Sequence, residues 1–111
     1  MSIPRKVLTS STLNLTSVAV RRQSDGILVI VRGDGPLRYQ VVPVDFRRLV
    51  LDFPGGISSL SFRVLPVGHA ILSQIRIGQD DRKLRLVFDL TIRAQYAIKK
   101  GLDFLAVQFK S

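Results

Sequence analysis

Few residues of this chain have the type and spacing that catalysis needs. Its one histidine, His69, stands in the irregular segment 67–70, and no serine lies in a Gly-x-Ser-x-Gly elbow. General acid–base catalysis relies mostly on histidine or on paired carboxylates with tuned pKa values, and a nucleophilic serine needs a base beside it. We interpret His69 as an ordinary loop residue and expect that the chain is not an enzyme.

Motifs that hold phosphates or metal ions are equally weak. The run Gly33-Asp34-Gly35 lacks the third glycine and the following helix of a dinucleotide-binding motif. Asp80 and Asp81 have the chemistry of a cation site, but adjacent aspartates between two strands are typical of turns. The chain has no cysteine, which excludes disulfides and cysteine zinc sites. We therefore expect no cofactor and no metal.

The chemistry that the sequence does offer is cationic. The net charge is +9, from 17 basic and 8 acidic residues, and such a charge favours polyanions, acidic polymers or anionic membrane surfaces. Residues 74–79 and 84–90 alternate apolar and polar side chains across an acidic turn. Successive side chains of a strand point to opposite faces, so these residues predict a hairpin with one packed face. Its other face carries Arg76, Arg85 and Asp89.

Short strands account for the rest of the chain. The length of 111 residues suits one domain, and we divide it into a lead-in at residues 1–11 and a folded domain at residues 12–111. We count about eight short strands and no helix, at residues 13–22, 27–32, 37–41, 49–53, 74–79, 84–90, 93–99 and 104–109. A phase slip near Thr16 suggests a bulge. The apolar run 27–31 predicts a strand covered on both faces, with residues 57–72 as its cover.

The two halves of the sequence resemble each other. At an offset of 57 residues, Val18 matches Ile75 and Ile27 matches Leu84, and with one deletion residues 49–53 match residues 105–109. Each half would then supply about four strands whose apolar faces need a cover, so we expect two such sheets to close on each other. The predicted fold class is all-β: a pseudo-symmetric β-sandwich of two small sheets.

The outer faces of the two expected sheets differ in charge. The sheet of the second half would expose Arg76, Arg85, Asp89, Arg93, Gln95 and Lys99, whereas the first would expose Arg21, Arg32, Arg38 and Arg48 beside Leu28, Ile30 and Val42. The former has the character of a solvated face, and the latter of a partly covered one.

Nucleic acid is an alternative partner for so basic a chain. Single-strand binders interleave basic residues with exposed aromatic rings on which bases stack. Here Tyr39, Tyr96, Phe53, Phe88 and Phe109 are in phase with the apolar face, so we assign them to the core. The pattern fits an acidic polymer better, and we expect no nucleic acid as partner. A solvated arginine-rich surface without a partner remains the alternative.

Membrane and export signals are missing from the sequence as it stands. No apolar run approaches the roughly 18 residues of a membrane span, so we expect no transmembrane segment. The N-terminus lacks a charged region followed by an apolar one. If the domain works outside the cytoplasm, we expect it to be part of a larger precursor.

Two stretches resemble a known family. The run Ile75-Arg76-Ile77-Gly78-Gln79 followed by residues 84–90, and the earlier run at residues 48–55 with its Leu-Asp-Phe-Pro-Gly ending, are similar to the AMIN domain over residues 13–109. The resemblance implies a β-sandwich from a periplasmic protein, a type IV pilus secretin or an N-acetylmuramoyl-L-alanine amidase, that binds peptidoglycan and localises the attached machinery. Catalysis or pore formation would belong to other parts of that protein.

The physical reading agrees with this resemblance. Peptidoglycan stem peptides carry carboxylates, which the planar fork of arginine binds in a bidentate manner. We predict a peptidoglycan-binding face formed by Arg76, Arg85, Arg93, Gln95 and Lys99, and on overall similarity we favour a secretin over an amidase as the host. Other envelope or pilus proteins are further candidate partners, which would make the domain a protein-interaction module.

Overall fold

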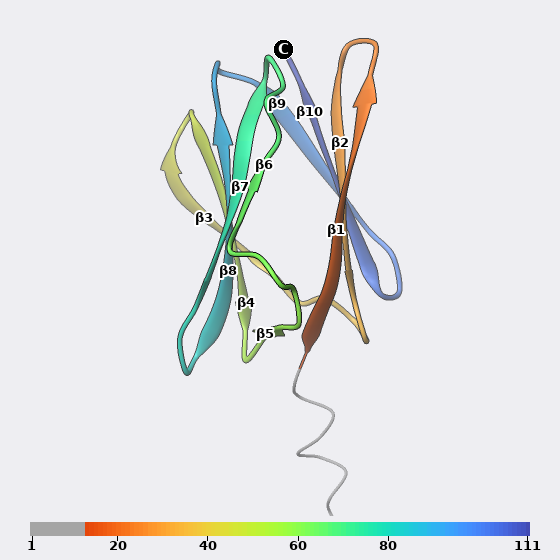
Figure 1. Ribbon diagram of the computed structural model, residues 1–111, viewed down its shortest axis with the longest axis vertical. Coiled ribbons are helices and arrows are strands. Elements are labelled where there is room, and N and C mark those ends of the chain that lie inside the picture. The colour runs from red at the N-terminus through yellow and green to blue at the C-terminus, as the bar shows by residue number, and fades with distance from the viewer. Residues whose placement is uncertain (1–12) are drawn as a thin grey trace, which may run out of the picture.

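The structure, a computed structural model, describes residues 13–111, and the lead-in predicted at residues 1–11 lies outside the described residues. Ten strands and no helix make up the described part (Figure 1). They are β1 (Asn14–Gln23), β2 (Gly26–Gly33), β3 (Gln40–Asp45), β4 (Arg48–Pro54), β5 (Ile57–Ser58), β6 (Val64–Pro66), β7 (Leu72–Gln79), β8 (Lys83–Leu90), β9 (Gln95–Lys100) and β10 (Phe104–Lys110). The all-β prediction is confirmed, and the two additional strands are the short β5 and β6.

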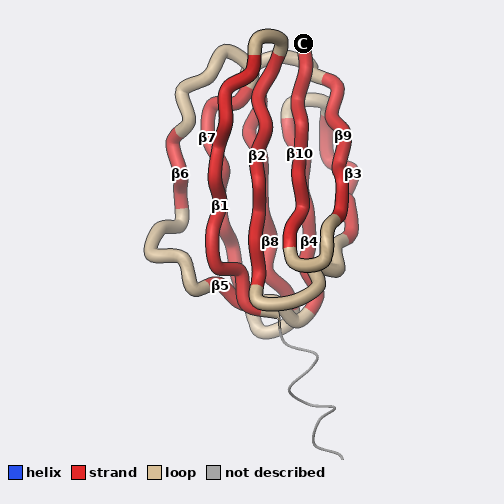
Figure 2. The backbone as a smooth tube through the Cα atoms, turned by 90° about the vertical axis from the view of Figure 1, so that its right-hand side faces the viewer, coloured by secondary structure: helices blue, strands red, loops and turns tan. Residues whose placement is uncertain are grey.

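The strands form two five-stranded sheets that pack face to face as a sandwich (Figures 1 and 2). Sheet A has the order β5-β1-β2-β10-β9, and sheet B has the order β3-β4-β8-β7-β6. Neighbours are antiparallel except β1 and β5, which run parallel. The connections at residues 34–39 and 91–94 cross from one sheet to the other.

The internal repeat is present in the strand register. Val20 pairs with Val29 in sheet A, and the residues 57 positions later, Ile77 and Leu86, pair in sheet B. The order β1-β2-β10-β9 likewise corresponds to β7-β8-β4-β3, so the sandwich is pseudo-symmetric as predicted.

The expectation that each half builds its own sheet is wrong. Each half contributes its first hairpin to one sheet and its second hairpin to the other, so β9 and β10 lie beside β2, and β3 and β4 lie beside β8. Alternation shows which side of a strand is buried but not which strand lies next to it, and exchanged hairpins bury the same apolar faces.

A bulge interrupts the first strand of each repeat. The β1–β2 register shifts between Leu15 and Ser17, as the phase slip at Thr16 predicted. The β7–β8 register shifts between Leu72 and Gln74, which are the equivalent positions. The bulge is thus part of the repeated unit.

The core lies between the sheets and uses every second residue of the long strands. Val29, Leu51, Leu86 and Val107 are fully buried examples from β2, β4, β8 and β10. The rings of Phe88 in sheet B and Phe109 in sheet A lie 5.5 Å apart between centroids, tilted by 49°. Of the five aromatic residues assigned to the core, Phe53, Phe88 and Phe109 are buried and Tyr39 packs against the core, whereas Tyr96 on the edge strand β9 is 48% exposed.

Residues 57–72 do not cover β2, contrary to the prediction. They form β5 at the edge of sheet A and β6 at the edge of sheet B, and the outward side chains Leu28 and Ile30 of β2 are half-buried by neighbours in their own sheet. An edge strand with open backbone groups also needs covering, and β6 supplies this cover for part of β7.

Candidate functional site

The predicted binding residues do not share one face. Arg76 on β7 and Arg85 on β8 lie on the outer face of sheet B, whereas Gln95 and Lys99 lie on β9 of sheet A. Arg93 stands in the crossing connection between the sheets, with its guanidinium 4.5 Å from the ring centroid of Phe46. The cause of this division is the hairpin exchange, which moves β9 away from β7 and β8.

Arg85 is held by a carboxylate from the neighbouring strand. Asp52 of β4 stands opposite Arg85 in the register, and the guanidinium donates two hydrogen bonds to it, from Nε at 2.7 Å and from Nη2 at 2.9 Å. This contact joins the two stretches that carried the family resemblance, since Asp52 belongs to the Leu-Asp-Phe-Pro-Gly run. In the same run Gly55 adopts a φ of 72°, a left-handed conformation that favours glycine.

A second carboxylate, Asp89 of β8, collects three polar side chains. Arg76 donates to it from Nε at 2.7 Å and from Nη2 at 2.9 Å, and Gln74 donates from Nε2 at 2.8 Å. Arg48 of β4 approaches from the other side, with its Nε 4.0 Å from the carboxylate. The outer face of sheet B is therefore crossed by ion pairs that link β4, β7 and β8.

These contacts change the proton affinity of both carboxyl groups. Hydrogen bonds from Arg85 lower the pKa of Asp52, and they outweigh the opposing effect of burial. Burial raises the pKa of Asp89, but hydrogen bonds from Arg76 and Gln74 outweigh it, so the net pKa is lowered. Both aspartates are anionic at neutral pH and neutralise the two arginines that they bind.

The ion pairs flank a shallow groove of about 520 Å³ on this face. Its floor contains Val50 and Val87, and Gly78 leaves open space where another residue would place a side chain. Val50 points outward yet is only 3% exposed. The aliphatic stems of arginines pack against apolar surface while their guanidinium groups stay in water. The groove therefore combines an apolar floor with polar walls.

Two further arginines, Arg48 and Arg63, line the groove. Arg63 precedes β6, is exposed and forms no ion pair with the residues that the structure describes. Arg48 has only the long contact to Asp89 and is 49% exposed. Four arginines against two aspartates give the groove a net charge of about +2, and Arg48 and Arg63 carry the excess.

Sequence reasoning missed Arg48 and Arg63 as members of the site. Arg48 was assigned to the opposite face because its strand was grouped with the first half of the chain. Arg63 lies in the irregular segment, where no periodicity indicates an orientation. Alternation along β4 did contain a usable signal, since it places Arg48, Val50 and Asp52 on one face.

The equivalent face of sheet A has different chemistry. The pair Gln108 and Leu28 stands at the positions of Asp52 and Arg85. Ala19 takes the place of Arg76, and Ile30 that of Val87. The pseudo-symmetric fold therefore carries the charged groove on one outer face, and at the equivalent positions of the other face it carries Gln108 and aliphatic residues.

The residues considered for catalysis and metal binding have structural roles. The Nδ1 atom of His69 accepts a hydrogen bond from the amide of Ile71 at 3.1 Å. Asp80 accepts backbone hydrogen bonds from Arg82 and Lys83, as in a turn, and these lower its pKa. Across residues 13–111 no three potential metal ligands of the His, Cys, Asp and Glu types cluster.

Comparison with known protein families decides the assignment. A family model of the AMIN domain matches residues 15–109, nearly the whole chain. This chain belongs to the AMIN domain family. AMIN domains are noncatalytic, generally bind peptidoglycan, and occur in secretins and amidases of the periplasm.

Comparisons of this AMIN domain with curated proteins and with solved structures gave no significant match. In the described part, no helix has the length and apolar character needed to cross a membrane.

Proposed function

We propose that this AMIN domain binds peptidoglycan through the outer face of sheet B and thereby localises a periplasmic machine. The observation that carries the proposal is the groove, in which Arg48 and Arg63 stand free of close ion pairs beside an apolar floor. We expect the two arginines to contact carboxylates of the stem peptides. We expect Val50 and Val87 to contact methyl groups and the faces of sugar rings.

In this proposal Arg76 and Arg85 do not form ion pairs with the ligand. Each uses Nε and Nη2 for its aspartate, so a ligand meets the remaining N–H groups of a guanidinium that is already neutralised. We propose that the two ion pairs hold the groove in shape and donate single hydrogen bonds. Gln95 and Lys99 lie on sheet A, and Arg93 stacks on Phe46 outside the groove, so the three take no part in this contact.

The experiment is cosedimentation of the domain with purified sacculi, compared with sacculi whose carboxylates have been amidated by a carbodiimide and ammonia. Each exposed arginine–carboxylate contact is worth on the order of 0.2–1 kcal/mol and is screened by salt. We expect retention at low salt, loss as salt rises, and weak retention on the amidated sacculi. Equal retention on both preparations would contradict recognition of carboxylates.

For the host protein we propose a type IV pilus secretin, with a cell-wall amidase as the alternative, on overall family similarity. A secretin or a zinc amidase domain in the same gene product decides between them. Peptidoglycan binding by the isolated domain is expected in both cases.

A further inference from the structure

The edge of β1 is open where the equivalent edge of β7 is covered. β1 pairs along its length with β2, but on its other side only Asn14 and Leu15 have a partner, in β5. On β7, the strand β6 pairs with residues 74–76. The matching residues of β1 are Ser17–Ala19. On the side away from β2 they have no neighbouring strand in the part of the chain that the structure describes.

The picture from the side shows the same difference between the sheets. β6 extends past β1 at the margin of the sandwich, and β5 accompanies β1 only near one end (Figure 2). The middle of β1 is therefore an edge of sheet A without a neighbouring strand on its outer side among the described residues.

The backbone of β1 is oriented to pair with such a strand. On β7 the amide of Ile77 donates to the carbonyl oxygen of Arg63, just before β6, at 2.8 Å. Val20 is the equivalent of Ile77 with the same pairing register toward the central strand. The backbone amide and carbonyl of Val20 thus face the open edge. Because the direction of these groups alternates along a strand, the backbone groups of Val18 and Arg22 face the same edge.

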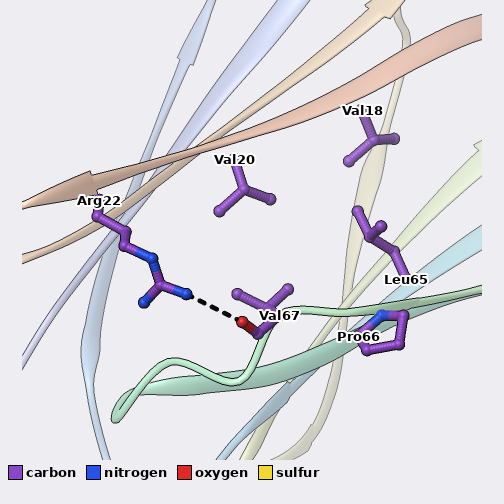
Figure 3. Close-up of a pocket in the computed structure, with 6 residues that line it drawn as sticks. All are labelled: Val18, Val20, Arg22, Leu65, Pro66 and Val67. Carbon is purple, nitrogen blue, oxygen red and sulfur yellow. Dashed lines mark hydrogen bonds between the residues drawn. The ribbon is translucent and has the colours of Figure 1, made fainter.

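The side chains of the same residues line a cleft of about 290 Å³ below the edge. Val18, Val20 and Arg22 form one wall, and Leu65, Pro66 and Val67 of the opposite sheet form the other (Figure 3). Arg22 crosses the cleft and donates from Nη2 to the carbonyl oxygen of Val67 at 3.2 Å. Alternate side chains of an added strand would enter this mainly aliphatic space.

The segments on the two sides of the cleft carry positive charge. Residues 13–24 and 53–72 contain no aspartate or glutamate and hold Arg21, Arg22 and Arg63. A second copy of this domain would bring two such edges together and add like-charge repulsion. An acidic strand is complementary to the edge.

We propose that the open edge of β1 binds an extended acidic segment of a partner protein by strand addition, with apolar residues at every second position entering the cleft. Backbone hydrogen bonds to Val18, Val20 and Arg22 supply register, and the acidic side chains, which alternate with the apolar ones and lie on the other face, pair with Arg21. This site is separate from the groove on sheet B, so one domain can hold the polymer and a protein together.

The test is an NMR titration of the domain with a capped peptide of alternating aspartate and valine, about seven residues long, the length that spans such an edge. We expect saturable shifts of the amide signals of Val18, Val20 and Arg22. In a strand the backbone amides of alternate residues point to opposite edges. Two N-methylated peptides, one methylated at the valines and one at the aspartates, are therefore a matched pair, because each lacks the amide donors of one edge of the peptide strand. One should bind as the parent does, and the other should not bind.

Three controls define what would overturn the proposal. Arg21→Gln should weaken binding roughly two- to fivefold while the protein spectrum stays folded. A lysine–valine peptide should not bind. Equal binding of both methylated peptides, or shifts confined to the groove on sheet B, would show charge attraction without strand addition. Shifts of the β1 signals with protein concentration alone would assign the edge to a second copy.

Discussion

Replacing Asp52 by asparagine removes the charge of one ion pair at nearly constant volume. Asp52 accepts two hydrogen bonds from Arg85, and its side chain is 10% exposed while that of the arginine is 42% exposed. A hydrogen bond to a charged group contributes about 1.5–3 kcal/mol, and water replaces part of it at an arginine so exposed. We expect a loss of about 1–2 kcal/mol at neutral pH, or about 5–10 °C in melting temperature.

The effect of Asp52→Asn should depend on pH with a definite sign. Arg85 lowers the pKa of Asp52 below its ordinary value of 3.8. A carboxyl group with a lowered pKa in the folded state stabilises fully above its ordinary pKa, and this stabilisation is lost as the pH falls through the lowered value. The wild type should therefore approach Asp52→Asn in stability as the pH falls below the ordinary pKa of 3.8 and through the lowered pKa of Asp52.

Urea unfolding at pH 7, 5, 3 and 2 measures this difference. Asp81→Asn is the matched control, because Asp81 is exposed and forms no ion pair in the described structure, while the charge change is the same. We expect the control to follow the wild type at every pH. A deficit of Asp52→Asn that is as large at pH 2 as at pH 7, or a deficit shared by Asp81→Asn, would refute the assignment to this ion pair.

Three other changes have defined outcomes. Phe88→Ala removes a fully buried ring from its contact with Phe109 and should cost about 3–5 kcal/mol in urea unfolding. Gly26→Ala should cost about 1–3 kcal/mol, because a Cβ there would collide with the backbone carbonyl of Phe109, whereas Gly35→Ala has open space and should change little. In sacculus cosedimentation below the melting temperature, Asp52→Asn should lower retention roughly two- to fivefold because Arg85 loses the carboxylate that holds it in the groove, and unchanged retention would contradict a role of this ion pair in the site.

Much of the local structure was predictable from the sequence. Period-two alternation located most of the eight longer strands and their buried faces, and the phase slip at Thr16 located the bulge. It placed β3 (Gln40–Asp45) too early, at residues 37–41, and wrongly buried Tyr96 on β9. The offset between Val18 and Ile75 predicted a pseudo-symmetric sandwich. The strands and the bulge depend on residues close together in the chain, where alternation is informative, and the sandwich follows from the repeat of that pattern.

Strand neighbours were not predictable in the same way. The partner of Arg85 is Asp52, 33 residues earlier, and nothing in either strand indicates that the two stand opposite each other. The pairing follows from the exchange of hairpins between the two halves. Arg63 joins the groove for a different reason, since it precedes β6, a short strand in an irregular part of the sequence that pairs with β7.

The two outer faces of this pseudo-symmetric fold are unlike. Each outward residue lies on one sheet only, so a difference between equivalent residues changes only that face of the sandwich. Asp52 and Arg85 on sheet B correspond to Gln108 and Leu28 on sheet A. The symmetric core is thereby kept while the surface chemistry differs.

Cosedimentation of the Arg48→Gln/Arg63→Gln variant with sacculi tests the central claim most directly. The matched control is Arg32→Gln/Arg38→Gln, which removes two exposed arginines away from the groove with the same charge change. Two exposed contacts together correspond to roughly a tenfold change in affinity. We predict a loss of this size for the groove variant and little loss for the control. Equal losses in the two variants, or none in the groove variant, would contradict binding at sheet B.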